Sequence, residues 1–289
     1  MTVTIPSQNQ LGRTRMGEVD LLHGDCIDVL RTLPAGSVDS VVTSPPYAMQ
    51  RASTYGGIPE KDYPEWAVAW MQEVWRVLKD DGSAIINISP HIKNGELSDY
   101  VLRTRLALRE AGWKELTELA WVKSDPIPTG RPDRPRRSLE SLLWFGKHGR
   151  AYGDPKSAGT AAKNGSMQHL GARRGGDMNH HGHGYASGKR DVKISRVTDV
   201  FYGATNNENH DHPAPFPVSL AEWCGKLITP PGGTILDPFT GSSSTGVAAI
   251  RNGWNFIGID QSAEYIDMSN RRLNAELAKA TEEHDDGQD

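Results

Sequence analysis

The clearest structural pattern in the sequence is Thr234-Ile-Leu-Asp-Pro-Phe-Thr-Gly-Ser-Ser-Ser-Thr-Gly246. It predicts a buried strand that ends at Asp237, then a turn of small residues, and then a helix. In open α/β sheets, ligands bind outside the carboxyl ends of the strands, and small residues let the backbone approach a ligand closely. The G-x-G-x-x-G spacing of a dinucleotide-binding turn is missing. The stretch therefore indicates a ligand site of another kind, although by itself it also fits an ordinary strand-to-helix turn.

A second acid ends the next predicted strand, in Phe256-Ile-Gly-Ile-Asp260. An acid at about this offset from the first turn typically binds ribose hydroxyls. Taken alone, Asp260 also fits the N-cap of a helix that starts near Ser262. The two acids together favour a cofactor that contains ribose.

Strands and helices alternate on both sides of this region. Apolar runs predict strands at 19–24, 38–43, 83–88, 118–123, 141–145, 234–237 and 255–259. Helical spacing of apolar residues predicts helices at 27–33, 63–79, 97–111, 217–228, 243–252 and 263–280. This alternation predicts an α/β fold with a doubly wound, mostly parallel, Rossmann-like sheet.

The order of these elements predicts five segments. They are a flexible N-terminus (1–17), a first α/β half (18–147), a loop-rich insert (148–199), a second α/β half (200–280) and a flexible acidic tail (281–289). The insert is rich in Gly, His, Lys and Arg and has little periodicity. We expect one sheet that is built from both halves, with the insert between them.

Composition excludes several classes of protein. The formal net charge of the 289 residues is −4, so nucleic acid would have to bind through a local basic patch. Cys26 and Cys224 suit neither a disulfide framework nor a metal-binding pair, and we expect both thiols to be buried. No apolar run approaches the roughly 18 residues of a membrane span, and the N-terminus lacks the apolar core of a signal peptide. We therefore expect a cytoplasmic protein that does not bind membranes.

The second chemical motif is Val41-Val-Thr-Ser-Pro-Pro-Tyr47, which follows a predicted buried strand. Consecutive prolines fix the backbone and remove two N–H donors, so carbonyl oxygens, a hydroxyl and an aromatic ring remain. This set suits an amino group on a flat base: the Ser44 hydroxyl and the Pro45 carbonyl accept its hydrogens, and Tyr47 stacks on the ring. A Pro-Pro turn also occurs as a simple strand terminator.

The two motifs together resemble the amino-group DNA methyltransferases, which modify N4 of cytosine or N6 of adenine. Thr43-Ser-Pro-Pro-Tyr47 looks like the catalytic motif of that family, and Asp237-Pro-Phe-Thr-Gly-Ser242 looks like its cofactor motif. Their order is that of the β group, with the target-recognition segment between them. The resemblance covers about residues 19–147 and 200–275, and it implies a methyltransferase sheet with S-adenosyl-L-methionine as the cofactor.

The resemblance also implies roles for individual residues. The catalytic residues would be Ser44, Pro45, Pro46 and Tyr47. The cofactor-binding residues would be Asp25, Phe216, Pro217, Asp237, Pro238, Phe239, Gly241, Ser242, Ser243 and Asp260. Ser243 departs from the family, which usually has glycine at this position, and this departure puts cofactor affinity in question. No metal is expected.

The implied reaction is direct, in-line transfer of a methyl group to an exocyclic amino nitrogen. A stacked and paired base must first leave the duplex. No covalent enzyme intermediate forms, so no catalytic cysteine is required. Family members with Ser at the first motif position tend to modify cytosine, so Ser44 favours N4 of cytosine. Adenine N6 is the alternative.

Two basic clusters would contact DNA. One lies beside the catalytic motif, at Arg131, Arg134, Arg136 and Arg137. The other belongs to the basic residues of the middle segment: Lys147, Arg150, Lys156, Lys163, Arg173, Arg174, Lys189, Arg190, Lys193 and Arg196. A solvated surface loop is the alternative for this segment. His169, His180, His181 and His183 match no zinc spacing, so they are interpreted as loop residues.

Two further functions compete with DNA methylation. An RNA or a free small molecule could be the substrate of the same fold, or the protein could be a non-enzymatic DNA-binding relic. The basic insert and the Ser-Pro-Pro-Tyr motif argue against the first, and the intact catalytic motif argues against the second. The resemblance implies double-stranded DNA as the partner and leaves open a cognate restriction endonuclease and a homodimer.

Overall fold

The fold is described by a computed structural model for residues 9–14, 17–49, 57–126, 132–159, 194–205 and 216–285. Its nine-stranded sheet has the order β1-β2-β11-β10-β3-β4-β8-β7-β9. These strands are β1 (Asn9–Thr14), β2 (Gly17–His23), β3 (Val38–Thr43), β4 (Leu78–Ile88), β7 (Lys114–Lys123), β8 (Leu139–Gly146), β9 (Val200–Gly203), β10 (Thr234–Asp237) and β11 (Asn255–Asp260). A short hairpin of β5 (Ile92–Lys93) and β6 (Glu96–Leu97) stands apart.

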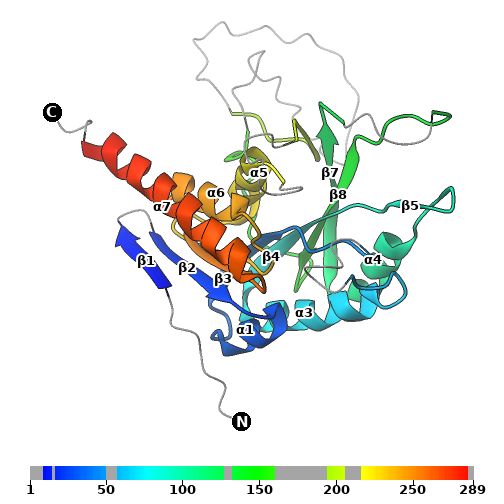
Figure 1. Ribbon diagram of the computed structural model, residues 1–289, viewed down its shortest axis with the longest axis horizontal. Helices are drawn as coiled ribbons and strands as arrows, with labels where there is room; N and C mark the ends of the chain where they lie inside the picture. The colour runs from blue at the N-terminus through cyan, green and yellow to red at the C-terminus, as the bar shows by residue number, and fades with distance from the viewer. Residues whose placement is uncertain are drawn as a thin grey trace, which may run out of the picture.

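Six helices accompany the sheet in the described ranges: α1 (Cys26–Thr32), α3 (Tyr63–Val77), α4 (Tyr100–Glu110), α5 (Val218–Ile228), α6 (Ser244–Asn252) and α7 (Ala263–Asp285). Helices α1, α3 and α4 lie on one face of the sheet, and α5, α6 and α7 lie on the other (Figure 1). This two-sided cover explains why β3 and β4 are buried along most of their length.

The central sheet is parallel, as predicted, so the predicted fold class is confirmed. Strands β2, β11, β10, β3 and β4 pair in parallel. Strand β8 is antiparallel to both of its neighbours, and β1 is antiparallel to β2. Apolar periodicity identifies a strand but carries no information on its direction, so the sequence could not predict the antiparallel pairs.

The two halves of the chain share this sheet. Strand β10 pairs with β3 on one side, where Leu236 lies beside Val41, and with β11 on the other. The ends of β3 and β10 therefore lie side by side, although Thr43 and Asp237 are far apart in the sequence. This pairing brings the two predicted chemical motifs to one edge of the sheet.

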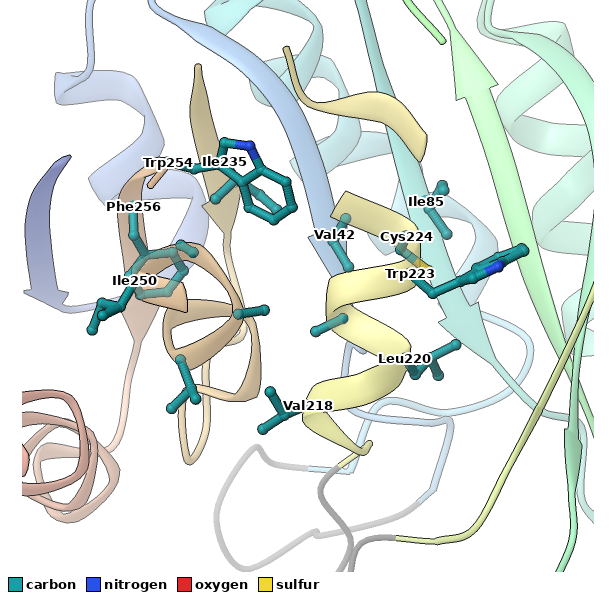
Figure 2. Packing of buried hydrophobic residues seen from close by; sticks show 14 of the residues in the cluster. Val42, Ile85, Val218, Leu220, Trp223, Cys224, Ile235, Ile250, Trp254 and Phe256 are labelled. Carbon is teal, nitrogen blue, oxygen red and sulfur yellow. The ribbon is translucent and has the colours of Figure 1, made fainter. Parts of the chain in front are cut away.

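Each face of the sheet has its own hydrophobic cluster. Figure 2 shows the cluster under α5 and α6, where Leu220 and Cys224 of α5 pack with Val42 and Ile235 of the sheet. The cluster on the other face includes Trp70 and Met71 of α3, both almost fully buried. Burying a large side chain of this kind contributes roughly 1.5–3 kcal/mol. Both cysteines are buried, as predicted.

Several predicted boundaries were wrong. Residues 9–14, predicted to be part of a flexible segment, form β1, because β2 offers a sheet edge that satisfies the backbone of a polar strand. Helix α7 continues to Asp285 instead of ending near Ala280. Helix α4 starts at Tyr100 rather than Leu97, since residues 96–97 pair in the β5–β6 hairpin. Strand β9 was not predicted.

No helix in the described ranges is long and apolar enough to cross a membrane.

Candidate active site

A pocket opens at the carboxyl ends of the parallel strands. It encloses about 470 Å³ of empty space up to its open mouth. Its lining residues come from the turns after β2, β3, β10 and β11 and from the start of α3: Asp25, Cys26, Pro46, Ile58, Trp66, Pro238, Phe239, Asp260 and Gln261. This is the edge at which open α/β sheets bind ligands.

The structure gives Asp260 an N-cap contact and places it at the pocket. Its Oδ2 accepts a hydrogen bond from the Gly241 backbone N–H at 2.9 Å. Its Oδ1 accepts one from the Ser262 N–H at 2.9 Å, which is an N-cap contact just before α7. The same side chain lines the pocket. Asp260 therefore fixes the turn after β10 and also offers a carboxylate edge to a ligand.

Asp25 also lines the pocket, and it is the N-cap of α1. Its side chain accepts hydrogen bonds from the N–H groups of Ile27 and Asp28. The preceding residue, Gly24, donates its N–H to the carbonyl of Asp260 at 2.9 Å. Gly24 has φ +154°, and a Cβ there would lie 2.8 Å from Val29. Glycine is required here because the chain must turn tightly to bring both acids to one pocket.

An aromatic wall completes the pocket. The ring of Phe239 lies 5.5 Å from that of Trp66 and 5.2 Å, edge to face, from that of Trp70. Packing of this kind fixes the orientation of Phe239. A flat apolar wall beside two acids that accept hydrogen bonds suits an adenine base with its ribose.

Buried thiols are poor nucleophiles, and burial raises the pKa of Cys26, which lines the same pocket.

Asp237 lies behind the pocket and braces it. The carboxylate is buried and accepts hydrogen bonds from the hydroxyls of Thr43 at 2.6 Å and Thr245 at 2.8 Å. It also accepts the Phe239 backbone N–H at 3.1 Å. These bonds join the end of β3, the turn after β10 and the start of α6. Asp237 is not among the lining residues, so it supports the ligand turn from within.

The titration of Asp237 gives a testable pH dependence. Burial raises the pKa of Asp237 to about 6, although the bonds from Thr43, Thr245 and Phe239 favour the ionised form. The folded protein therefore binds a proton more tightly than the unfolded chain does. As the pH falls from about 7 to about 4, this group should raise the free energy of unfolding by about 2 kcal/mol.

The substitution Asp237→Asn removes this titration while keeping the shape of the side chain. We expect the free energy of unfolding of the wild type, relative to that of the variant, to increase by about 2 kcal/mol when the pH is lowered from about 7 to about 4. Urea unfolding at a series of pH values measures this difference. Parallel curves for the two proteins would show that Asp237 does not titrate in this range.

Ser243, the departure from the family pattern, has a defined backbone role. It has φ 57° and ψ 45°, the left-handed conformation, which glycine adopts without strain and which costs other residues roughly 1–2 kcal/mol. Its hydroxyl lies 2.8 Å from that of Thr240, and its N–H donates to the Thr240 carbonyl. Ser243 is fully buried and outside the pocket lining, so the serine affects the turn rather than a direct ligand contact.

The remaining predicted cofactor residues lie around this turn. The Gly241 carbonyl accepts a hydrogen bond from Ser269 at 2.6 Å, and the Ser242 carbonyl accepts one from Arg272 at 2.7 Å, so α7 holds the turn in place. Phe216 and Pro217 precede α5, where Phe216 packs against the core. Of the ten predicted cofactor residues, Asp25, Pro238, Phe239 and Asp260 line the pocket.

The predicted catalytic residues follow β3 directly. Pro46 lines the pocket, and its carbonyl accepts a hydrogen bond from the Tyr63 hydroxyl at 3.0 Å. Pro45 is buried and Ser44 is partly exposed. The Tyr47 hydroxyl donates to Glu140 Oε2 at 2.8 Å. The Ser-Pro-Pro-Tyr segment thus lies at the pocket and is anchored at its far end by Tyr47.

Three residues at this site are not among the predicted site residues. Asn87 of β4 donates through Nδ2 to Glu140 Oε2 at 3.0 Å and to the Tyr47 hydroxyl at 3.2 Å. Lys123 of β7 forms an ion pair with Glu140 Oε1. The sequence does contain a signal, since Asn87, Lys123 and Glu140 are polar residues at the ends of predicted strands. Only the sheet order shows that they meet.

The predicted DNA-binding residues fall into three groups. Arg134 and Arg136 are exposed. Arg137 is exposed as well, but its guanidinium donates to the Pro90 carbonyl and to Ser89 Oγ, the latter at 3.1 Å. The others, Arg131, Arg173, Arg174, Lys189 and Arg190, lie outside the described residues, as do the predicted loop histidines.

One basic residue of the middle segment was assigned wrongly. Lys147 is buried and donates to the Leu78 carbonyl at 2.5 Å and to Asp80 at 3.3 Å, so it ties β8 to the start of β4. Arg150, Lys156 and Arg196 are exposed.

The fold and the pocket define the chain as an α/β protein with a pocket at the carboxyl edge of its sheet. Residues 38–271 match the family described as DNA methylase. The chain belongs to this family and is a DNA methyltransferase, which confirms the resemblance seen in the sequence.

Individual proteins that are similar to this chain are also DNA methyltransferases or DNA methylases by name. The type II methyltransferase M.Cfr9I of Citrobacter freundii is 29% identical in an alignment of 293 positions that covers 89% of this chain and 88% of the relative. The structure of PvuII DNA methyltransferase (cytosine-N4-specific) matches with a TM-score of 0.65 at 20% identity, covering 91% of this chain and 92% of that one. The structure of a DNA modification methylase from Thermus thermophilus, complexed with S-adenosyl-L-methionine, matches with a TM-score of 0.60 at 22% identity. This match covers 89% of this chain and 95% of that one. Both structures share the fold.

Proposed function

We propose that this DNA methyltransferase transfers a methyl group from S-adenosyl-L-methionine to the N4 amino group of cytosine in duplex DNA. The observation that carries the proposal is the shared pocket. Pro46, from the Ser-Pro-Pro-Tyr segment, lines the same pocket as Phe239, in the turn after β10, and Asp260, at the end of β11. A methyl donor held by those turns would face the segment that accepts the target amino group.

The pocket suits the cofactor. The Asp260 and Asp25 carboxylates would bind the hydroxyls and amino groups of its nucleoside part, and Phe239 would pack against the adenine ring. When bound, S-adenosyl-L-methionine supplies an electrophilic methyl group on a sulfonium. The turn after β10 would lie beside it, in the shape set by Asp237 and Ser243.

The residues after β3 would prepare the nucleophile. An amino nitrogen on cytosine or adenine is a weak nucleophile because its lone pair is delocalised into the ring. Ser44 Oγ and the Pro45 carbonyl would accept the two amino hydrogens and draw the nitrogen towards a tetrahedral geometry, while Tyr47 would stack on the flipped base. Holding the reacting atoms in line is worth up to roughly 7–11 kcal/mol of the barrier.

The state of the two described thiols is consistent with direct transfer. Burial raises the pKa of both Cys26 and Cys224, which favours the unreactive thiol form. Ser44 at the first catalytic position favours cytosine, and the name of the PvuII enzyme, which shares the fold, points the same way. Adenine N6 is the alternative substrate for the same chemistry.

DNA would approach along the exposed arginines beside the catalytic segment. We expect Arg134→Ala and Arg136→Ala each to weaken binding about equally for all duplex sequences, because contacts to phosphate carry no base information. Each should make the slope of log affinity against log salt concentration shallower by about 0.9. Fluorescence anisotropy with labelled duplexes at several salt concentrations measures this slope.

The matched control for this prediction is Arg109→Ala. Arg109 is an exposed arginine near the end of α4, and its loss should leave the slope unchanged. Equal slopes for Arg134→Ala, Arg136→Ala and Arg109→Ala would remove this surface from the DNA interface.

The function itself is tested by the class of acceptor. The protein is incubated with methyl-labelled S-adenosyl-L-methionine and, separately, with mixed-sequence duplex DNA, RNA of the same sequence, and free nucleosides. We expect label in duplex DNA, and unlabelled duplex should compete for it. Label only in RNA or nucleosides would overturn the proposal. Binding of DNA without binding of the cofactor would favour a non-enzymatic DNA-binding protein.

Partners beyond DNA stay predictions. The type II name of the Citrobacter freundii relative supports a cognate restriction endonuclease. A homodimer is proposed on the family resemblance alone.

A further inference from the structure

A polar cluster holds the hydroxyl end of Tyr47. Glu140 Oε2 accepts hydrogen bonds from the Tyr47 hydroxyl at 2.8 Å and from Asn87 Nδ2 at 3.0 Å, and Glu140 Oε1 pairs with the Lys123 ammonium. The Glu140 side chain is only 10% exposed. A buried carboxylate is costly to assemble, and its removal would leave its three donors unpaired. Glu140, Asn87 and Lys123 are called the Tyr47 anchor below.

The anchor determines how the Tyr47 ring is turned. A phenol hydrogen prefers the plane of the ring, because a lone pair of the oxygen is delocalised into the ring. Tyr47 donates this hydrogen to Glu140, and its oxygen accepts a hydrogen bond from Asn87 Nδ2 at 3.2 Å. Rotation of the ring about its long axis would take both partners out of the ring plane. One acceptor and one donor together therefore fix the plane of the ring.

The backbone end of Tyr47 is fixed as well. The carbonyl of the preceding residue, Pro46, accepts a hydrogen bond from the Tyr63 hydroxyl at 3.0 Å. Tyr63 is almost fully buried and packs edge to face against Tyr100, with ring centroids 4.9 Å apart. Tyr47 is thus held from α3 at its backbone and from β4, β7 and β8 at its hydroxyl.

Lys123 leaves Glu140 Oε2 to the other two partners. Its ammonium pairs with Oε1 and lies over the Trp121 ring, 5.0 Å from the ring centroid. Burial and the neighbouring Glu140 carboxylate raise the pKa of Tyr47 well above its usual value, so the phenol keeps the hydrogen that it donates. The directions of the bonds in the anchor are therefore fixed.

Asn87 supports the view that the anchor serves Tyr47. Only the NH₂ of an amide can donate to a carboxylate, so Nδ2 must face Glu140. Asn87 Oδ1 is buried and has no hydrogen-bond partner among the residues that the structure describes. A buried acceptor without a partner costs free energy, and an apolar side chain would avoid this cost. The two bonds to Glu140 and Tyr47 are what the asparagine provides.

We propose that Glu140, with Asn87 and Lys123, is a positioning residue that fixes the Tyr47 ring as the surface on which the flipped target base stacks. This inference rests on the proposed function and deepens it, because it names the side chains that prepare Tyr47. A ring that is already held in place loses little freedom when a base stacks on it. The anchor would thereby stabilise the base outside the duplex.

Tyr47→Phe tests the anchor by removing the hydroxyl and keeping the aromatic ring. A hydrogen bond to a charged group corresponds to roughly a 10- to 100-fold change in the population of the arrangement that it favours. We expect a fall of this size in the single-turnover rate on paired duplex DNA. Affinity for S-adenosyl-L-methionine should change less than about two-fold, since the Tyr47 hydroxyl binds the anchor and not the pocket.

Glu140→Gln should cause a similar fall. Its amide oxygen must face the Lys123 ammonium, which turns the NH₂ towards Tyr47 and towards Asn87 Nδ2, itself a donor. If Glu140 acts through the Tyr47 hydroxyl, the double variant with Tyr47→Phe should be no slower than the slower single variant. Glu118→Gln is the matched control and should keep the wild-type rate, since Glu118 lies on β7 with a side chain that is 70% exposed.

A second duplex separates this role from a structural one. The site that the wild-type protein methylates is prepared with its normal partner strand and with an abasic position opposite the target base. An unpaired base costs less to flip, so a poorly held stacking surface matters less. The rate loss of Tyr47→Phe and of Glu140→Gln should shrink to less than about three-fold on the abasic duplex. General damage to the active site would slow methylation of both duplexes equally.

Tyr47→Phe keeps the ion pair of Glu140 with Lys123, so it tests the inference even if Glu140→Gln folds poorly. Three results would overturn the inference: a wild-type rate for a folded Tyr47→Phe protein on paired DNA, equal rate losses on the two duplexes, or losses that multiply in the double variant. A wild-type protein that methylates no duplex DNA would instead overturn the proposed function.

Discussion

Ser44→Ala should lower the methyl-transfer rate by roughly 100- to 1,000-fold, the usual effect of losing one oriented polar group at a reacting centre. The alanine removes the hydroxyl oxygen that is proposed to accept a hydrogen of the target amino group. It leaves in place the residues that line the pocket and the hydrogen bond from the Tyr63 hydroxyl to the Pro46 carbonyl. Cofactor affinity should therefore stay within about two-fold of wild type, and the loss should appear in the single-turnover rate.

Ser37→Ala is the control for this prediction. Ser37 lies before β3, where its hydroxyl donates locally to the Pro34 carbonyl at 2.8 Å, and its loss should not affect the rate. A Ser44→Ala protein with the wild-type rate would contradict the assignment of Ser44. A protein that had lost cofactor binding as well would move Ser44 from the nucleophile side of the reaction to the cofactor side.

Asp260→Ala should weaken the binding of S-adenosyl-L-methionine by roughly 30- to 1,000-fold, which corresponds to about 2–4 kcal/mol. The side chain lines the pocket and also accepts the N–H groups of Gly241 and Ser262. Its removal would take away the acceptor proposed for the ribose and release the turn that shapes the pocket. Losses of this order are typical when a buried charged group leaves its hydrogen-bond partners unpaired.

Isothermal titration with the cofactor measures the effect of Asp260→Ala. Asp260→Asn, which keeps one carbonyl oxygen, should be intermediate. Glu264→Ala is the matched control, because Glu264 is an exposed acid in the first turn of α7 and should not affect affinity. Wild-type affinity in a folded Asp260→Ala protein would place the cofactor outside this pocket.

Local patterns were enough to predict the central fold. Strand β10 has the predicted bounds, 234–237, and β11 and α6 differ from their predictions by one residue at one end. Apolar runs and small-residue turns are properties of neighbouring residues, which a single sequence displays directly. Strand β1 could not be found in this way, because its residues are polar and its pairing depends on the free edge of β2.

The acids at the ends of β10 and β11 show that the sequence predicts the position of a side chain better than its contacts. The sequence placed Asp237 and Asp260 at strand ends, and both are there. It could not show that the hydroxyls of Thr43, 194 residues away, and Thr245 would occupy the Asp237 oxygens. The two acids therefore look equivalent in the sequence and differ in the structure, where one braces the turn from behind and the other faces the pocket.

The catalytic network was the hardest part to predict. Tyr47, Asn87 and Glu140 are separated by 40 and 53 residues, and they meet because β8 pairs antiparallel with β4. Nothing in a local pattern fixes that pairing. The Ser-Pro-Pro-Tyr segment could be recognised because its chemistry lies in four consecutive residues, whereas the side chains that orient it are dispersed along the chain.

The most direct test of the account is the identity of the methylated nucleoside. Duplex DNA treated with the protein and methyl-labelled S-adenosyl-L-methionine is digested to nucleosides, and the labelled product is identified by mass spectrometry. We expect N4-methylcytosine. N6-methyladenine would contradict the choice of base and keep the amino-group chemistry. Label on carbon 5 of cytosine would contradict the mechanism itself, since it would demand an attacking nucleophile that neither buried cysteine supplies.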